Sequence, residues 1–202
     1  MDPRNTAVLA IHWQRDIVKR EGAFGEFYGE MVERTGVIER SVSLLASARA
    51  RNVPIFYTRV CYSEGHPELD ANCPLLDLVG QRKALVGGSP GAMIIPELSP
   101  QPGDVVVSHT RVAGTQGTNL VEQLRARDIK HAAILGVSTN ISVESTARNL
   151  ADAGFDVHVV ADCCTTSTQE AHDASIATLG LLTRTIMNAD EFIVDFARGG
   201  QA

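Results

Sequence analysis

The stretch HAAILGVSTNISVESTAR, residues 131–148, carries the pattern that decides the fold. Its first seven residues form a short apolar run, typical of a buried strand, and a helical pattern follows over residues 140–153. Gly154 suits the end of that helix, and a second apolar run, FDVHVVA, begins at Phe155. A strand, a helix and another strand in this order are typical of an α/β fold with a parallel sheet.

The same alternation extends over the rest of the chain. Apolar runs predict further strands at residues 6–12, 53–60, 104–109 and 185–187. Helical periodicity predicts helices over residues 37–51 and 118–127, and the capping box Ser167-x-x-Glu170 predicts the start of another. We therefore predict a single domain, residues 1–202, folded as a three-layer α/β/α sandwich around a mostly parallel six-stranded sheet.

A proline-rich segment over residues 61–103 interrupts this alternation. More than 40 residues are long for a simple connection between two strands. We expect this segment to contain short helices and to cover a site.

Composition and charge exclude several classes of function. The 24 acidic and 18 basic residues leave a net charge of −6, and without a basic stripe we expect no nucleic-acid partner. No apolar run approaches the roughly 20 residues of a membrane span. The four cysteines show neither zinc-site nor disulfide spacing, and no signal peptide is visible, so we expect a reduced, cytoplasmic protein. Phosphate-binding glycine motifs are missing, so we expect no cofactor.

Four strand ends carry candidate residues. They are His12 and Trp13 after the first strand, residues 59–61 at the end of the second, residues 108–109 at the end of the third, and residues 137–142 after the fourth, which include Ser142. Ligands bind at the carboxyl ends of parallel strands, so these positions predict a site.

Several segments resemble the isochorismatase-like, or cysteine hydrolase, superfamily. Residues 136–148, GVSTNISVESTAR, resemble the signature G-V-x-T-N-x-C-V-x-x-T-A-R of that family. Residues 7–18, AVLAIHWQRDIV, resemble its A-L-L-V-I-D-M-Q-N-D-F-V, and residues 154–162 resemble its G-Y-x-V-x-V-x-x-D. The resemblance spans about residues 6–190. It implies a homo-oligomeric hydrolase that cleaves a C–N amide or carbamate bond, or a C–O bond, in a small polar substrate.

The resemblance also implies where the catalytic residues lie. The family's amidases use an Asp, a Lys and a Cys, and these positions fall on His12, His109 and Ser142, so all three are substituted. A serine hydroxyl needs an aligned base, which one histidine can supply while the other acts as acid or orienter.

Further candidate residues surround this centre. Trp13, which follows a strand end, and Arg111, Val137 and Ser138 are candidates to bind substrate, and the resemblance implies that the Val137–Ser138 peptide bond is cis. Asp16 matches a second family Asp that is expected to fix a loop by hydrogen bonds.

Other interpretations of the catalytic positions stay open at this point. The chain can be a catalytically degenerate binding or regulatory paralogue, or it can use water in place of Ser142 as the nucleophile. Substitution by His and Ser, which still move protons, favours an enzyme.

Two further arrangements of side chains need consideration. His12 and His109 can bind zinc with His66 as a third ligand, although the metal motif of the family's nicotinamidases is missing, and we expect no metal. Residues 136–140, GVSTN, nearly match a nucleophile elbow, with Asp162 and His172 in the right order, but Asn140 replaces its last glycine.

Overall fold

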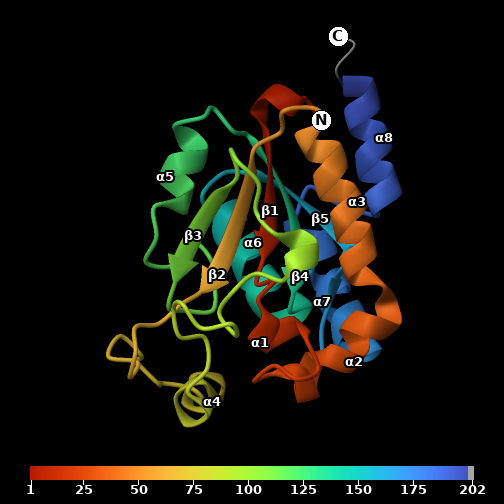
Figure 1. The fold of residues 1–202 in the computed structure, drawn as a ribbon. Helices are drawn as coiled ribbons and strands as arrows, with labels where there is room; N and C mark the ends of the chain where they lie inside the picture. The colour runs from red at the N-terminus through yellow and green to blue at the C-terminus, as the bar shows by residue number, and fades with distance from the viewer. Residues whose placement is uncertain (200–202) are drawn as a thin grey trace.

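The computed structural model describes residues 1–199 and shows one six-stranded sheet (Figure 1). All its strand pairs are parallel, in the order β3-β2-β1-β4-β5-β6. The strands are β1 (Thr6–Ile11), β2 (Ile55–Val60), β3 (Val105–His109), β4 (His131–Val137), β5 (Asp156–Thr165) and β6 (Thr185–Met187). The predicted α/β class and six-stranded sheet are confirmed.

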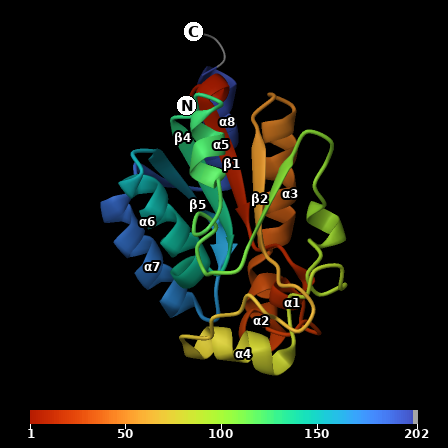
Figure 2. The ribbon, with the colours of Figure 1, turned by 90° about the vertical axis from the view of Figure 1, so that its left-hand side faces the viewer.

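Helices cover both faces of the sheet and complete the three layers (Figure 2). One face carries α3 (Val37–Arg49) and α8 (Ala189–Gly199). The other carries α5 (Leu120–Arg125), α6 (Glu144–Asp152) and α7 (Gln169–Leu182). The central strands are therefore enclosed from both sides: every residue of β1 is buried, which explains why its sequence, TAVLAI, is almost continuously apolar.

Three short helices lie beyond the carboxyl ends of the strands, at the bottom of the view in Figure 1. They are α1 (Arg15–Val18), α2 (Gly25–Thr35) and α4 (Pro74–Arg82). The expected short helices of residues 61–103 are confirmed as α4 and a 3-10 turn at Pro96–Leu98.

Asp16 ties these segments together. Its carboxylate accepts hydrogen bonds from the backbone amides of Leu85 and Ala23, at 2.9 and 3.3 Å. The carboxylate also lies against Gly91, where an added Cβ would approach it to 2.3 Å. The expected loop-fixing role of Asp16 is confirmed.

The structure differs from the sequence prediction at several element ends. Neither α2 nor α8 was predicted, and β5 extends to Thr165, beyond the expected end at residue 161. The N-cap of α7 is Thr168, whose hydroxyl accepts from the Ala171 amide at 3.1 Å, so the expected capping box at Ser167 is wrong by one residue. Two hydroxyl-bearing residues in sequence compete for the cap, and only the backbone path decides between them.

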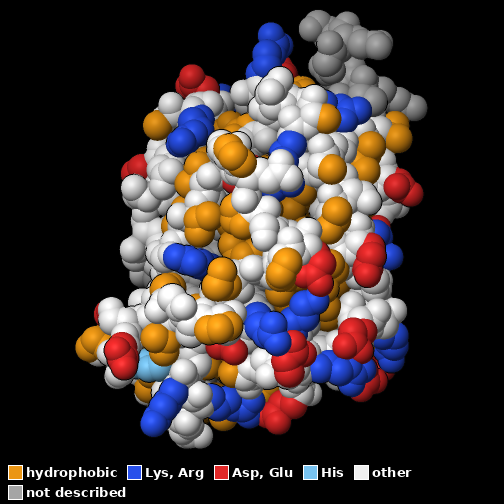
Figure 3. Space-filling model, viewed as in Figure 1, with side chains coloured by type: hydrophobic (Ala, Val, Ile, Leu, Met, Phe, Trp, Pro, Cys, Tyr) orange, Lys and Arg blue, Asp and Glu red, His pale blue; other side chains and the backbone are white. Residues whose placement is uncertain are grey.

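Basic and acidic side chains are interspersed on the face seen in Figure 3, with hydrophobic atoms between them. Within residues 1–199, no helix has the length and apolar character that crossing a bilayer requires.

Substitution of Gly136 tests the close pairing of β4 with β1. It has φ +139°, and a Cβ at this position would lie 2.1 Å from the carbonyl oxygen of Ile11 on β1. We expect Gly136→Ala to lower the free energy of unfolding by several kcal/mol. The positive φ disfavours any residue with a side chain, and the Ile11 carbonyl oxygen occupies the space that a Cβ would need. The measurement is urea unfolding at neutral pH. The control Gly180→Ala, inside α7 with no atom closer than 3.9 Å, should be neutral or slightly stabilising. Equal effects of both substitutions would contradict the close approach.

Candidate active site

Three predicted residues lie at the carboxyl edge of the sheet. His12 follows β1 with a positive φ of +55°, and its amide donates to the Thr58 carbonyl oxygen of β2. His109 is the last residue of β3. Ser142 lies in a π-helical turn, Thr139–Val143, that connects β4 to α6. A π-turn at a helix start is uncommon and frequently accompanies a functional site.

The two histidines form a direct contact. Their Nε2 atoms are 3.0 Å apart, and the rings stack with centroids 5.0 Å from each other. Nδ1 of His109 lies 2.9 Å from the Arg111 carbonyl oxygen. Because a carbonyl oxygen only accepts, His109 Nδ1 carries a hydrogen.

This network assigns the tautomers of both rings. A neutral His109 with its hydrogen on Nδ1 accepts at Nε2, so His12 must donate from its own Nε2. The remaining nitrogen of His12, Nδ1, is then unprotonated. The pair therefore presents one basic nitrogen, and it belongs to His12.

Burial keeps both imidazoles neutral. His12 and His109 are 3% and 4% exposed. Burial lowers the pKa of His109 from 6.5 to about 4. The pKa of His12 lies well below 6.5, chiefly because of burial and secondly because of the neighbouring His109. A charged imidazolium would lose its hydration here without an opposite charge to replace it.

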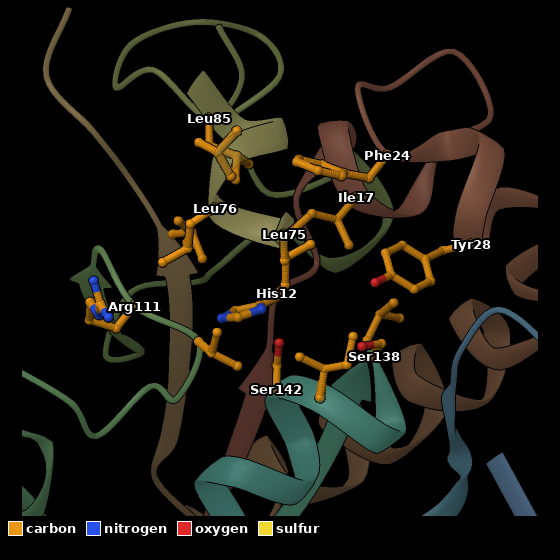
Figure 4. A pocket seen from close by; sticks show the side chains of 15 residues that line it. His12, Ile17, Phe24, Tyr28, Leu75, Leu76, Leu85, Arg111, Ser138 and Ser142 are labelled. Carbon is orange, nitrogen blue, oxygen red and sulfur yellow. The ribbon is translucent and has the colours of Figure 1, made fainter. Parts of the chain in front are cut away.

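A pocket opens beside this pair (Figure 4). Its lining residues come from the strand ends, from α1, α2 and α4, and from the start of the helix at Ser142: His12, Ile17, Phe24, Tyr28, Val60, Leu75, Leu76, Val79, Leu85, Arg111, Val112, Val137, Ser138, Ile141 and Ser142. His109 does not line the pocket and supports His12 from behind. Residues 61–103, which were expected to cover a site, contribute α4 and Leu85 to the lining of this pocket.

Ser142 faces this pocket next to His12. Its side chain points toward the His12 ring in Figure 4, and the residue is 7% exposed. No hydrogen bond joins its hydroxyl to either imidazole or to any other described residue. The hydroxyl is therefore free to meet a ligand.

The four predicted substrate-binding residues separate into two groups. Arg111, Val137 and Ser138 line the pocket, and the Val137–Ser138 peptide bond is cis as expected. Trp13 does not line it: its side chain is fully buried in the hydrophobic core. The prediction that Trp13 binds substrate is therefore wrong, because its large apolar ring is enclosed in the core and not in the pocket wall.

The structure forms neither the zinc site with His66 nor the nucleophile elbow with Asp162 and His172. His66 lies apart from the pair, with Nε2 2.7 Å from the Ala84 carbonyl oxygen, and no group of three His, Cys, Asp or Glu suited to a metal occurs within the described residues. The elbow arrangement fails because His172 Nδ1 contacts the Thr139 hydroxyl at 2.9 Å, while Asp162 accepts from the Ala189 amide at 2.8 Å.

Sequence reasoning missed the residues that shape the pocket. Phe24 and Tyr28 belong to the turn and helix around α2, and Leu75, Leu76 and Val79 belong to α4. The run PLLDLVGQR, with proline at its start, is an available signal for α4. Nothing local in the sequence relates either helix to His12.

The buried histidines predict loss of stability in acid. The lowered pKa of His109 means that the unfolded chain takes up its proton near pH 6.5, before the folded protein does. Stability from this group is complete above pH 6.5 and is lost as the pH falls to about 4, by on the order of 3 kcal/mol. Urea unfolding across that range measures it. His109→Gln should make the dependence shallower, and an unchanged slope would contradict a buried neutral His109.

Comparisons with known proteins place the chain in a family. A family profile described as "Isochorismatase domain" matches residues 6–191. The uncharacterised isochorismatase family protein YecD of Escherichia coli O157:H7 is 29% identical, over 87% of this chain and 88% of YecD. Ureidoacrylate amidohydrolase RutB of Agrobacterium fabrum is 30% identical, over 74% of this chain and 71% of RutB.

A solved structure agrees with this placement at the level of the fold. The cysteine hydrolase from Pseudomonas syringae pv. phaseolicola superimposes with a TM-score of 0.85 at 24% identity, covering 98% of this chain and 95% of that one. The profile match extends over nearly the whole described chain, from the first residue of β1 into α8. The chain belongs to the isochorismatase family.

Proposed function

We propose that this protein hydrolyses a C–N amide or carbamate bond, or a C–O bond, of a small substrate without a cysteine nucleophile. The observation that carries the proposal is the neutral His12–His109 pair, whose single basic nitrogen lies on the residue that lines the pocket with Ser142. No cysteine lines that pocket among the described residues. Family membership and the amide-hydrolysing name of the relative RutB support this class of reaction.

The proposed mechanism begins with attack by the serine. The Ser142 oxygen bonds to the carbonyl carbon while its proton passes to His12 Nδ1. The bond to the leaving nitrogen or oxygen then breaks, and that atom takes the proton from His12. Water adds to the acyl-serine, releases the acid and restores the hydroxyl. Because burial disfavours the imidazolium, His12 returns the proton readily.

His109 acts as a positioning residue in this scheme. It touches His12 and not the pocket, and its bond to the Arg111 carbonyl oxygen keeps its Nε2 free to accept from His12. Amide groups at the start of the helix that holds Ser142 supply dipoles for the developing oxyanion.

Water attack is the second candidate mechanism. Ser142 forms no hydrogen bond to the imidazole of His12 or of His109, and this favours water attack. His12 Nδ1 can equally accept a hydrogen bond from a water molecule. In that case Ser142 orients the water or the substrate. The two mechanisms share the base and differ in the covalent intermediate.

The proposal extends to partners and location. We propose a small-molecule substrate, a cytoplasmic location and a homo-oligomer that binds no nucleic acid. The four unpaired cysteines support a reducing compartment.

Replacement of Ser142 separates the mechanisms. We expect Ser142→Ala to lower kcat by about three orders of magnitude or more with the fold intact, because the nucleophile is removed. The assay is turnover of a panel of amides, carbamates, esters and vinyl ethers. Ser145→Ala, three residues further along the helix and outside the pocket lining, is the matched control and should keep full activity. An active Ser142→Ala protein would assign the attack to water, and no turnover in the unmodified protein would favour a binding paralogue.

The pH dependence of kcat/KM tests the base. Since the pKa of His12 lies well below 6.5, activity should stay level as the pH falls through 6.5 and decline only at clearly lower pH. Rates are measured in overlapping buffers down to the onset of acid unfolding. An acid limb centred at or above 6.5 would contradict a buried neutral His12 as the base.

A further inference from the structure

The wall of the pocket is apolar over most of its extent. Ten aliphatic or phenyl side chains line it: Ile17, Phe24, Val60, Leu75, Leu76, Val79, Leu85, Val112, Val137 and Ile141. Figure 4 shows several of them surrounding His12 and Ser142 from the side opposite the sheet. Within the described residues, neither an acidic side chain nor a lysine lines this pocket.

The one cationic residue of the lining already has partners. The guanidinium of Arg111 donates to the Asp70 carbonyl oxygen at 3.0 Å and to Asn72 Oδ1 at 3.1 Å. It also forms an ion pair with the Asp70 carboxylate at 3.6 Å. Arg111 therefore anchors residues 70–72, and its guanidinium is engaged by these hydrogen bonds and by the exposed Asp70 carboxylate. A substrate carboxylate would lose its hydration in this pocket, where the one cation of the described lining is already held by residues 70–72.

The other polar side chains of the lining fall into two pairs. Tyr28 and Ser138 both line the pocket, and Figure 4 shows their hydroxyls at one end of it. His12 and Ser142 form the reacting pair described above. The polar side chains of the described lining therefore form small groups within an otherwise apolar wall.

From this arrangement we propose that the protein selects substrates whose acyl portion is uncharged and apolar, either branched aliphatic or aromatic. The inference rests on the proposed hydrolase function and narrows it. The sequence predicts a small polar substrate. The apolar lining restricts the polar part of that substrate to the bond that is cleaved. The wall from α1, α2 and α4 takes up the apolar portion, and the carbonyl carbon faces Ser142 and His12.

A matched series of p-nitroanilides and p-nitrophenyl esters tests the selection. Within each series the leaving group is constant, and the acyl group is 3-methylbutanoyl, benzoyl, succinyl or glutaryl. We expect kcat/KM for the two neutral acyl groups to exceed that for the two carboxylate-bearing groups by about 100-fold or more, since an unpaired charge must be desolvated. Equal rates, or faster turnover of the succinyl compound, would overturn the proposal.

A charge introduced into the wall provides a second test. Leu76→Arg places a cation without a partner in the apolar lining, and it should reduce the preference for benzoyl over succinyl by at least tenfold. Leu181→Arg, on an 87% exposed position of α7, is the control and should leave the preference unchanged. A preference unchanged by folded Leu76→Arg would overturn the assigned wall. The comparison of substrates on the unmodified protein does not depend on this variant.

Binding without turnover separates this inference from the hydrolase proposal. Calorimetry measures binding of benzamide, 3-methylbutanamide and succinamate to Ser142→Ala. Preferential binding of the two neutral amides supports the apolar selection even if the unmodified protein hydrolyses none of the test compounds, in which case only the hydrolase proposal fails. Preference for succinamate, or no binding of any of the three, contradicts the selection.

Discussion

The close approach of β4 to β1 at Gly136 is the constraint on which the site depends. Gly136 pairs with Ile11, and the Ile11 carbonyl oxygen occupies the space that any side chain at 136 would need. His12 follows Ile11, and Val137 to Ser142 follow Gly136. Holding these two backbones together therefore brings the histidine and the start of the helix to one place. Gly136, which does not itself line the pocket, thus determines how close His12 lies to the start of that helix.

Desolvation determines the electrostatics at that place. This chain buries two neutral imidazoles at these strand ends, and the two rings bond to each other. Neutral rings tolerate burial better than an incomplete ion pair does. The contact with the Arg111 carbonyl oxygen then directs the hydrogens so that one basic nitrogen remains. The burial that lowers stability in acid is the same burial that keeps His12 unprotonated near neutrality.

Two kinds of element form the pocket: the strand ends of the sheet, and short helices that lie beyond them. The strand ends of a six-stranded sheet hold His12 and Ser142, the proposed reacting groups, while α1, α2 and α4 supply most of the apolar wall. These added helices are attached by buried polar contacts. Asp16 accepts from Leu85 and Ala23, and Gln14 exchanges hydrogen bonds with Val60 and also donates to Ala92. Such a division lets the selectivity for substrate change with the covering segments while the reacting groups stay in place.

The sequence by itself determined the six strands and the helices α3, α5, α6 and α7, because buried parallel strands require continuous apolar runs and the helices between them require a different period. It also placed His12, His109 and Ser142 at strand ends, since all strands of a parallel sheet end at one edge. Only the tertiary structure decided that Trp13 packs in the core, that α2 brings Tyr28 to Ser138, and which nitrogen of His12 is basic. Those outcomes depend on contacts between residues far apart in the chain, for which no local pattern exists.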